Sequence, residues 1–223
     1  MNLIQKILDE QSDIDGIIAL IENGADIHAE NDYVLRYASR NGHLQIVELL
    51  NENGANVHAS DDAALRWAAG RGYLQIVELL LENGADIHAS EDGALRWASE
   101  NGHLQVVELL FKNGADARAR NDYALCAASC TGHIKVVELL LENGANIHAE
   151  NDYALRYAVH YGHIQVAELL KRYQNMEDIT IRVDKDLKDR IKEVGVISLN
   201  KILRQLLMID AVEVEEKVRY IEM

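Results

Sequence analysis

Apolar side chains follow a helical spacing in the segment that runs from His43 to Asn53. They lie three and four positions apart on one wide stripe, with polar residues opposite, which is typical of an amphipathic helix with one buried face. Gly54 predicts the end of this helix, because a residue without a Cβ enters the left-handed conformation cheaply. The stripe consists of Leu44, Ile46, Val47, Leu49 and Leu50.

A second, shorter helix is predicted in another part of the chain, from Tyr153 to about His160. Asp152 stands directly before it as the predicted N-cap, because its carboxylate can accept hydrogen bonds from N–H groups two or three residues later. Gly162 predicts the end of this helix.

These two helices recur along the chain with a period of 30 residues. Each unit therefore consists of helix, turn, helix and loop, and such a pair cannot bury its apolar face unless neighbouring units stack on it. We call a set of residues at the same position of successive units a column. Two glycine columns and one aspartate column mark the period. They are Gly24, Gly54, Gly84, Gly114 and Gly144; Gly42, Gly72, Gly102, Gly132 and Gly162; and Asp32, Asp62, Asp92, Asp122 and Asp152.

Two runs within this unit resemble the ankyrin repeat. They are Gly-His-Leu-Gln-Ile-Val-Glu-Leu-Leu from Gly42 and Glu-Asn-Gly-Ala-Asp-Ile from Glu82. The resemblance covers residues 1 to about 174 and implies a mainly α fold, an ankyrin-repeat solenoid. Residues 1–30 are then a capping repeat, and the further repeats begin at residues 31, 61, 91, 121 and 151.

The chain departs from the ankyrin pattern where the first helix of each unit begins. Tyr-Ala-Leu-Arg, as at Tyr153 to Arg156, replaces the usual Thr-Pro-Leu-His, and the chain has no proline. The unit is also shorter than the ~33 residues of the family. The missing residues fall between Ala59 and Leu65, where the family has a projecting β-hairpin. Short units without proline resemble the ankyrin arrays of giant DNA viruses.

A different pattern begins at Met176. Polar and apolar residues alternate from Asp178, which predicts a strand over residues 179–183. Two short helices are predicted to begin at Asp184 and Ser198. This strand-helix-helix segment resembles the ribbon-helix-helix family of dimeric DNA-binding proteins. The matching runs are the 179–183 ribbon, Asp-Leu-Lys-Asp-Arg-Ile from Asp186 and Ser-Leu-Asn-Lys-Ile-Leu-Arg from Ser198.

The ribbon-helix-helix resemblance implies a homodimer held by residues 176–209, within a second domain of residues 176–223. It also implies DNA contacts, on base edges and on a phosphate at a helix start. Against DNA, Glu177 and Asp178 place negative charge near the ribbon, and residues 176–209 carry seven basic and six acidic residues. The acidic tail from Asp210 is either a partner-binding helix or a third packing helix. The implied DNA contacts are Thr180, Arg182, Ser198 and Asn200.

Composition and charge narrow the class of protein. The chain has 223 residues, two cysteines and a net charge of -15. Few cysteines and no secretory start predict an intracellular, reducing compartment, cytoplasm or nucleus. No apolar run reaches the length of a membrane-spanning helix. Residues 1–175 carry 13 basic and 26 acidic residues, so the array is expected to attract basic partner surfaces and to repel DNA.

The nine histidines and two cysteines are the residues that could form a metal or redox site. Eight of the nine histidines form two columns whose members lie one repeat apart, too far to share an ion at the ~2.0–2.1 Å ligand distance. Structural polar contacts are therefore favoured. Cys126 and Cys130 lie four residues apart on one helix, and two free thiols are favoured over a redox or metal pair. No nucleophile, base and orienting residue form a set, so we predict no enzyme, cofactor or metal.

Columns along the first helices supply the candidate binding residues. An aromatic column, interrupted at Ala127, predicts packing between repeats with ring edges left for a partner, because Trp and Tyr dominate hot spots. An arginine column four residues after the aspartates allows weak helical ion pairs, and a structural role is favoured for it. Columns that vary between repeats can encode specificity, and in the ankyrin family this helix end faces the concave side. The arginines are Arg36, Arg66, Arg96 and Arg156. The candidate protein-binding residues are Tyr37, Arg40, Trp67, Arg71, Trp97, Glu100, Cys130, Tyr157, His160 and Tyr161.

The sequence therefore predicts a non-catalytic protein–protein interaction scaffold. It would bind a protein partner on the concave ankyrin face and be homodimeric through its C-terminal segment. The alternative is a DNA-binding transcriptional regulator whose array recruits a partner. An artificial junction of the two segments is a third interpretation, because Met176 could be a start residue.

Overall fold

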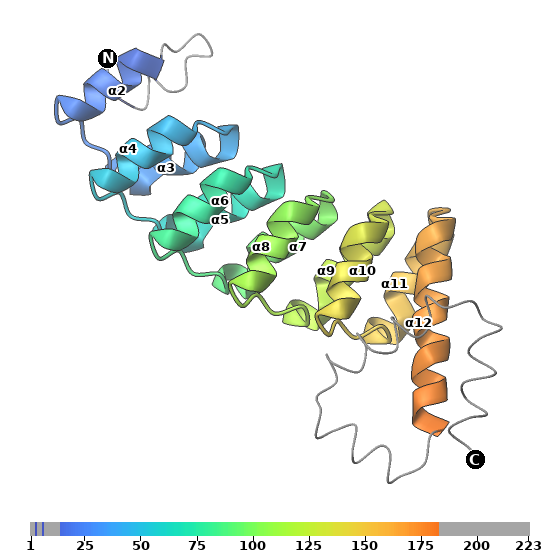
Figure 1. Cartoon of the computed structure of the whole chain (residues 1–223). Helices are drawn as coiled ribbons and strands as arrows, with labels where there is room; N and C mark the ends of the chain where they lie inside the picture. The colour runs from blue at the N-terminus through green and yellow to red at the C-terminus, as the bar shows by residue number, and fades with distance from the viewer. Residues whose placement is uncertain (1–2, 4–5, 7–13, 183–223) are drawn as a thin grey trace.

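The computed structural model describes residues 3, 6 and 14–182, which form helix pairs stacked in one row (Figure 1). In each pair a first helix is followed, two or three residues later, by a second helix. The first helices are α3 (Ala29–Asn41), α5 (Ala59–Arg71), α7 (Ala89–Glu100), α9 (Ala119–Thr131) and α11 (Ala149–His160). The second helices are α4 (Leu44–Glu52), α6 (Leu74–Glu82), α8 (Leu104–Lys112), α10 (Ile134–Glu142) and α12 (Ile164–Arg182), and α2 (Ile14–Glu22) precedes the row. The described residues contain no strand, and the predicted helical solenoid is confirmed.

Both glycine columns end helices, as the sequence predicts. Gly42 has φ 81° and ψ 19°, a left-handed conformation, and the His43 N–H then donates to the Ala38 carbonyl at 3.0 Å. Gly54 follows α4 with φ 84°. Because glycine adopts positive φ without a Cβ clash, these columns fix where each helix of the unit stops.

The core runs through the whole row as two leucine columns, one from each helix of the pair. These side chains are at most 1% exposed, and side chains of neighbouring repeats meet between them. The predicted stripe of α4 is confirmed, because Ile46, Val47 and Leu50 are buried while Leu44 and Leu49 are partly buried. The columns are Leu35, Leu65, Leu95 and Leu125 in the first helices, and Leu50, Leu80, Leu110 and Leu140 in the second helices.

A left-handed turn opens every first helix, and it stands where the family has its β-hairpin. Three consecutive residues that are not glycine have φ between 51° and 60°, for example Ser60, Asp61 and Asp62. Such a conformation costs about 1–2 kcal/mol per residue, so other contacts must hold it. The shorter repeat therefore replaces a projecting hairpin by one tight turn. The other turns are Glu30–Asp32, Ser90–Asp92, Arg120–Asp122 and Glu150–Asp152.

Three buried serines lie in one column of the first helices and have no hydrogen-bond partner for their hydroxyl oxygens among the described residues: Ser39, Ser99 and Ser129. Ala69 occupies the same column and is equally buried. An unpaired buried hydroxyl costs about 1–3 kcal/mol. We therefore predict that Ser99→Ala raises the free energy of unfolding by about 1 kcal/mol in urea denaturation. Ala69→Ser should lower it, and a loss of stability in Ser99→Ala would contradict the prediction.

The strand predicted over residues 179–183 is wrong in its described part, because residues 179–182 belong to α12. Earlier second helices stop at an Asn-Gly pair, whereas Tyr173-Gln174 stands in that place and no glycine follows before Gly195. The helix therefore continues. Thr180 and Arg182, predicted on a DNA-binding ribbon, lie on a helix instead.

The rest of the C-terminal prediction lies outside the described residues. This holds for the helices expected from Asp184 and Ser198, for Asn200 and for the acidic tail from Asp210. Within the described part of the chain, no helix combines the length and the apolar character that crossing a membrane requires.

Candidate protein-binding site

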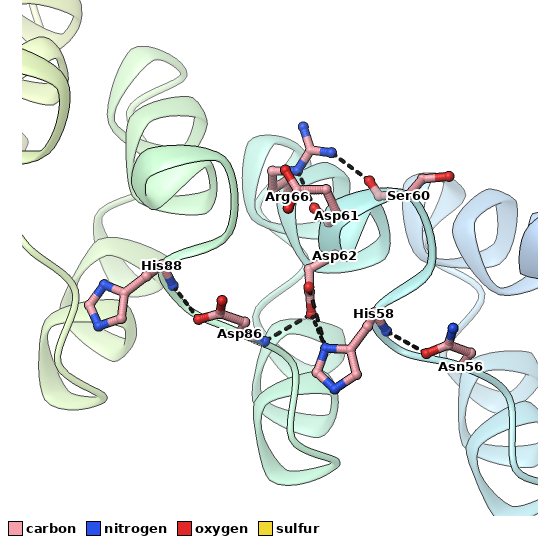
Figure 2. A network of polar contacts seen from close by, with 8 residues as sticks. All are labelled: Asn56, His58, Ser60, Asp61, Asp62, Arg66, Asp86 and His88. Atoms are coloured by element: carbon pink, nitrogen blue, oxygen red, sulfur yellow. Dashed lines mark hydrogen bonds and ion pairs between the residues drawn. The ribbon is translucent and has the colours of Figure 1, made fainter.

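A buried aspartate at the end of each of the first four left-handed turns binds the loop that leads to the next repeat (Figure 2). The Asp62 carboxylate accepts the N–H of Asp86, in the loop between α6 and α7, at 2.8 Å and lies 3.1 Å from Nδ1 of His58. Asp62 is only 4% exposed. The same bond to the loop links Asp32 to Asn56, Asp92 to Asp116 and Asp122 to Asn146.

The predicted N-cap role of this aspartate column is wrong. An N-cap residue has extended backbone angles, but Asp152 has φ 58° and ψ 36°. This turns the carboxylate away from the N–H groups of its own helix. In the last repeat, α12 continues through the positions of that loop, and the Asp152 carboxylate accepts a hydrogen bond from Nε2 of Gln174 at 3.0 Å. The column therefore holds the loop after each of the earlier second helices, and in the last repeat it holds α12.

The arginine column holds the left-handed turns in place. Arg66 donates from Nε to the Asp61 carbonyl and from Nη2 to the Ser60 carbonyl, both at 2.9 Å (Figure 2). Arg36 and Arg96 make the equivalent pairs of bonds. These bonds agree with the structural role favoured for the arginines. Among the described residues the ion pair with the aspartate column, which the spacing allows, is not formed, because these guanidinium groups bond to backbone carbonyls of the turn.

The histidine columns form structural polar contacts, which confirms that interpretation. His103 lies across the repeat boundary, with Nε2 3.1 Å from the Gly70 carbonyl. His133 and His163 repeat the contact with the carbonyls of Glu100 and Cys130. These carbonyls lie at the end of a first helix, where backbone acceptors lack helical partners. Over the described residues, no group of three His, Cys, Asp or Glu side chains is placed to hold a metal ion.

The first helices of neighbouring repeats lie side by side, held by these polar contacts. A hollow of about 700 Å³ lies across α3, α5 and α7. We call it the tryptophan groove. Arg40 stacks its guanidinium over Trp67, 5.4 Å from the ring centre. A Cβ on Gly70 would lie 3.1 Å from the Cβ of Trp97, so the glycine lets that ring pack closely. The lining residues are Arg40, Trp67, Gly70, Arg71, Trp97, Asn101 and His103.

A second hollow of about 430 Å³, the cysteine hollow, follows along the same row of first helices. It lies where the aromatic column is interrupted by Ala127 and the arginine column by Cys126. The Arg96 guanidinium accordingly stacks on Tyr123, 5.4 Å from its ring centre. The lining residues are Glu100, Arg120, Asn121, Tyr123, Cys126, Ala127, Cys130, Thr131, Glu150 and Tyr153.

The two thiols of the cysteine hollow have raised pKa values. Burial raises the pKa of the Cys126 thiol to about 12, with the neighbouring Cys130 adding to the shift. Burial also raises the pKa of Cys130 above its ordinary value. Both side chains are free thiols, and both stay protonated at neutral pH, whereas the thiolate is the nucleophile.

This burial predicts slow alkylation of Cys126. At pH 8, iodoacetamide should modify it at least about a hundredfold more slowly in the folded Cys130→Ser variant than in the same variant in urea, where the thiol pKa is ~8.5. The folded rate should keep rising with pH beyond 9, while the rate in urea levels off. Equal rates in both states, read by mass spectrometry, would show an accessible thiolate.

The remaining candidate residues lie at the two ends of this row. Tyr157, His160 and Tyr161 form an aromatic cluster on the last repeat, with ring centres 4.9 to 6.1 Å apart. Tyr37 packs partly against the core, and its ring centre lies 5.9 Å from that of Tyr33. The candidate residues thus occupy four places on or directly after the first helices rather than one.

Sequence reasoning missed several residues that line the two hollows: His103, Arg120, Asn121 and Tyr123. The interruption of two columns at Cys126 and Ala127 is a usable signal, because losing a large side chain leaves a hollow beside its neighbours. The histidine column predicts a structural contact for His103, but its place in the groove depends on Gly70 in the preceding repeat.

A family model described as ankyrin repeats, in three copies, matches residues 6–91 and 94–183. These matches cover most of the chain and agree with the stacked helix pairs, so the chain belongs to the ankyrin-repeat family. Ankyrin-repeat proteins are generally non-enzymatic scaffolds that bind other proteins. A comparison with curated proteins finds no match.

Proposed function

We propose that this protein is a non-catalytic scaffold that binds a protein partner through the tryptophan groove. The observation that carries the proposal is the clustering of Arg40, Trp67, Arg71 and Trp97 around one hollow. Aromatic rings and arginines are the side chains that contribute most to protein interfaces. The cysteine hollow and the aromatic cluster of the last repeat extend the proposed contact surface along the row.

The groove suits non-covalent recognition because it is largely ordered before a partner arrives. Trp97 packs on Gly70, and Arg66 lies over the Trp97 ring at 5.6 Å while it bonds to the turn. Both tryptophans are only partly buried, so their rings keep surface for a partner. Side chains that are already held in place lose less entropy on binding.

Affinity capture with the full chain tests the proposal. We expect Arg40→Ala combined with Arg71→Ala to weaken binding of the captured partner at least tenfold, because two exposed guanidinium groups leave the interface. Both side chains are exposed, so the fold should stay intact. Arg118→Ala removes an exposed arginine that does not line the groove and is the matched control. If the control and the double variant lose partner binding equally, or if neither loses it, the partner binds elsewhere.

Homodimerisation through residues 176–209 and DNA binding stay predictions from the sequence. Their implied residues either lie on α12 or fall outside the described residues. The mass in solution tests the dimer, and a gel shift with Arg182→Ala tests DNA binding, which should be salt-sensitive. The intracellular compartment and the likeness to arrays of giant DNA viruses likewise stay predictions.

A further inference from the structure

Charge is unevenly distributed over the array. The whole chain carries a net charge of -15, and the second helices contribute exposed carboxylates such as Glu48, Glu78 and Glu108. The tryptophan groove lies on the first helices instead. Its described lining includes the guanidinium groups of Arg40 and Arg71 but no carboxylate. The groove is therefore a basic site on an acidic protein.

The two groove arginines keep their hydrogen-bond donors available. Among the described residues, neither Arg40 nor Arg71 has an ion pair or side-chain hydrogen bond, and the Arg40 guanidinium lies over the face of the Trp67 ring. By contrast, Arg36 and Arg66 donate hydrogen bonds to backbone carbonyls of the turns. A free guanidinium binds a carboxylate through two parallel hydrogen bonds.

We propose that the tryptophan groove binds an acidic peptide segment of the partner. Carboxylates of that segment pair with Arg40 and Arg71, and an apolar side chain between them packs on Trp67 and Trp97. This inference rests on the proposed function and names its partner class. It reverses the expectation from net charge, because the local charge of the groove differs in sign from the charge of the array.

The chain has only two tryptophans, and both line the groove, so intrinsic fluorescence reports on this site. The full chain is titrated with a ten-residue glutamate-rich peptide that contains one central leucine, and with a lysine-rich peptide of the same design. We expect a saturable change with the acidic peptide only, weakened by added salt. Arg40→Glu with Arg71→Glu should weaken this binding at least tenfold, and Arg118→Glu should leave it unchanged.

Three outcomes would overturn the acidic-peptide inference. Binding of the lysine-rich peptide alone would mean that the partner is basic, and binding of neither peptide would mean that the groove lacks the proposed affinity. Competition by an equal concentration of inorganic phosphate would show a simple anion site rather than a peptide site. The capture experiment remains separate, so the groove can still be a protein-binding site if the charge of the partner is wrong.

Discussion

Replacing Asp92 with alanine should lower the free energy of unfolding by about 1.5–3 kcal/mol, the range for a hydrogen bond to a charged group. Asp92 is 4% exposed, accepts the Asp116 N–H at 2.8 Å and lies 3.1 Å from Nδ1 of His88. Alanine would leave that N–H without its acceptor and would release the loop that leads from α8 to α9. Urea denaturation of the full chain, followed by circular dichroism, measures the effect.

Asp92→Asn is the matched control for this prediction. Asparagine keeps a carbonyl oxygen in place of the accepting carboxylate oxygen, so it should retain more than half of the lost stability. The alanine variant should also unfold over a broader range of urea, because this loop connects two repeats and coupling between neighbouring repeats makes the array cooperative. A change below about 0.5 kcal/mol in Asp92→Ala, the level of an ordinary surface substitution, would show that the aspartate column does not hold these loops in place.

Replacing Gly102 with alanine is the other change with a large expected effect. Gly102 has φ 75°, which costs an alanine about 1–2 kcal/mol. Its new Cβ would also lie 2.5 Å from Nδ1 of His133, so the ring must move and lose its contact with the Glu100 carbonyl. A further 0.5–1.5 kcal/mol, about one hydrogen bond, should therefore be lost.

Gly54→Ala separates the two causes of that loss. Gly54 also has positive φ, 84°, but a Cβ there would meet nothing within 4 Å. Its alanine variant should show the conformational cost alone and be less destabilised than Gly102→Ala in the same urea series. If both variants lose the same stability, the histidine contact across the repeat boundary contributes nothing.

The sequence predicts the helices and their ends because these depend on residues close together along the chain. The stripe from Leu44 to Leu50 sets the buried face of α4, and Gly42 and Gly54 set its limits through local backbone geometry. Repetition strengthens this prediction, since the same local pattern appears in each unit. The family resemblance rests on these local patterns.

Contacts that depend on an unusual backbone conformation are not predictable in this way. The pattern at Asp152 predicts an N-cap, yet the acceptor role of its equivalent Asp62 depends on a left-handed backbone and on an N–H 24 residues further along the chain. The spacing of Arg66 allows an ion pair with Asp62, although the same turn presents its carbonyls to the guanidinium. An unusual backbone conformation redirects side chains, and spacing alone does not show it.

The error over residues 179–182 has a related cause. Alternating polar and apolar residues with β-branched side chains favour a strand locally. The preceding helix, however, reaches this segment without the Asn-Gly stop of the earlier repeats, and it bonds to the last repeat through Gln174 and Asp152. The missing stop signal outweighed the local alternation.

In the proposed function a protein partner binds on the first helices, at the tryptophan groove. Hydrogen–deuterium exchange of the full chain, with and without the captured partner, tests this binding site most directly. We expect new protection at the ends of α3 and α5 and in the Asn101–His103 turn, around Arg40, Arg71 and Trp97. Protection confined to the second helices α4, α6 and α8 would contradict the claim.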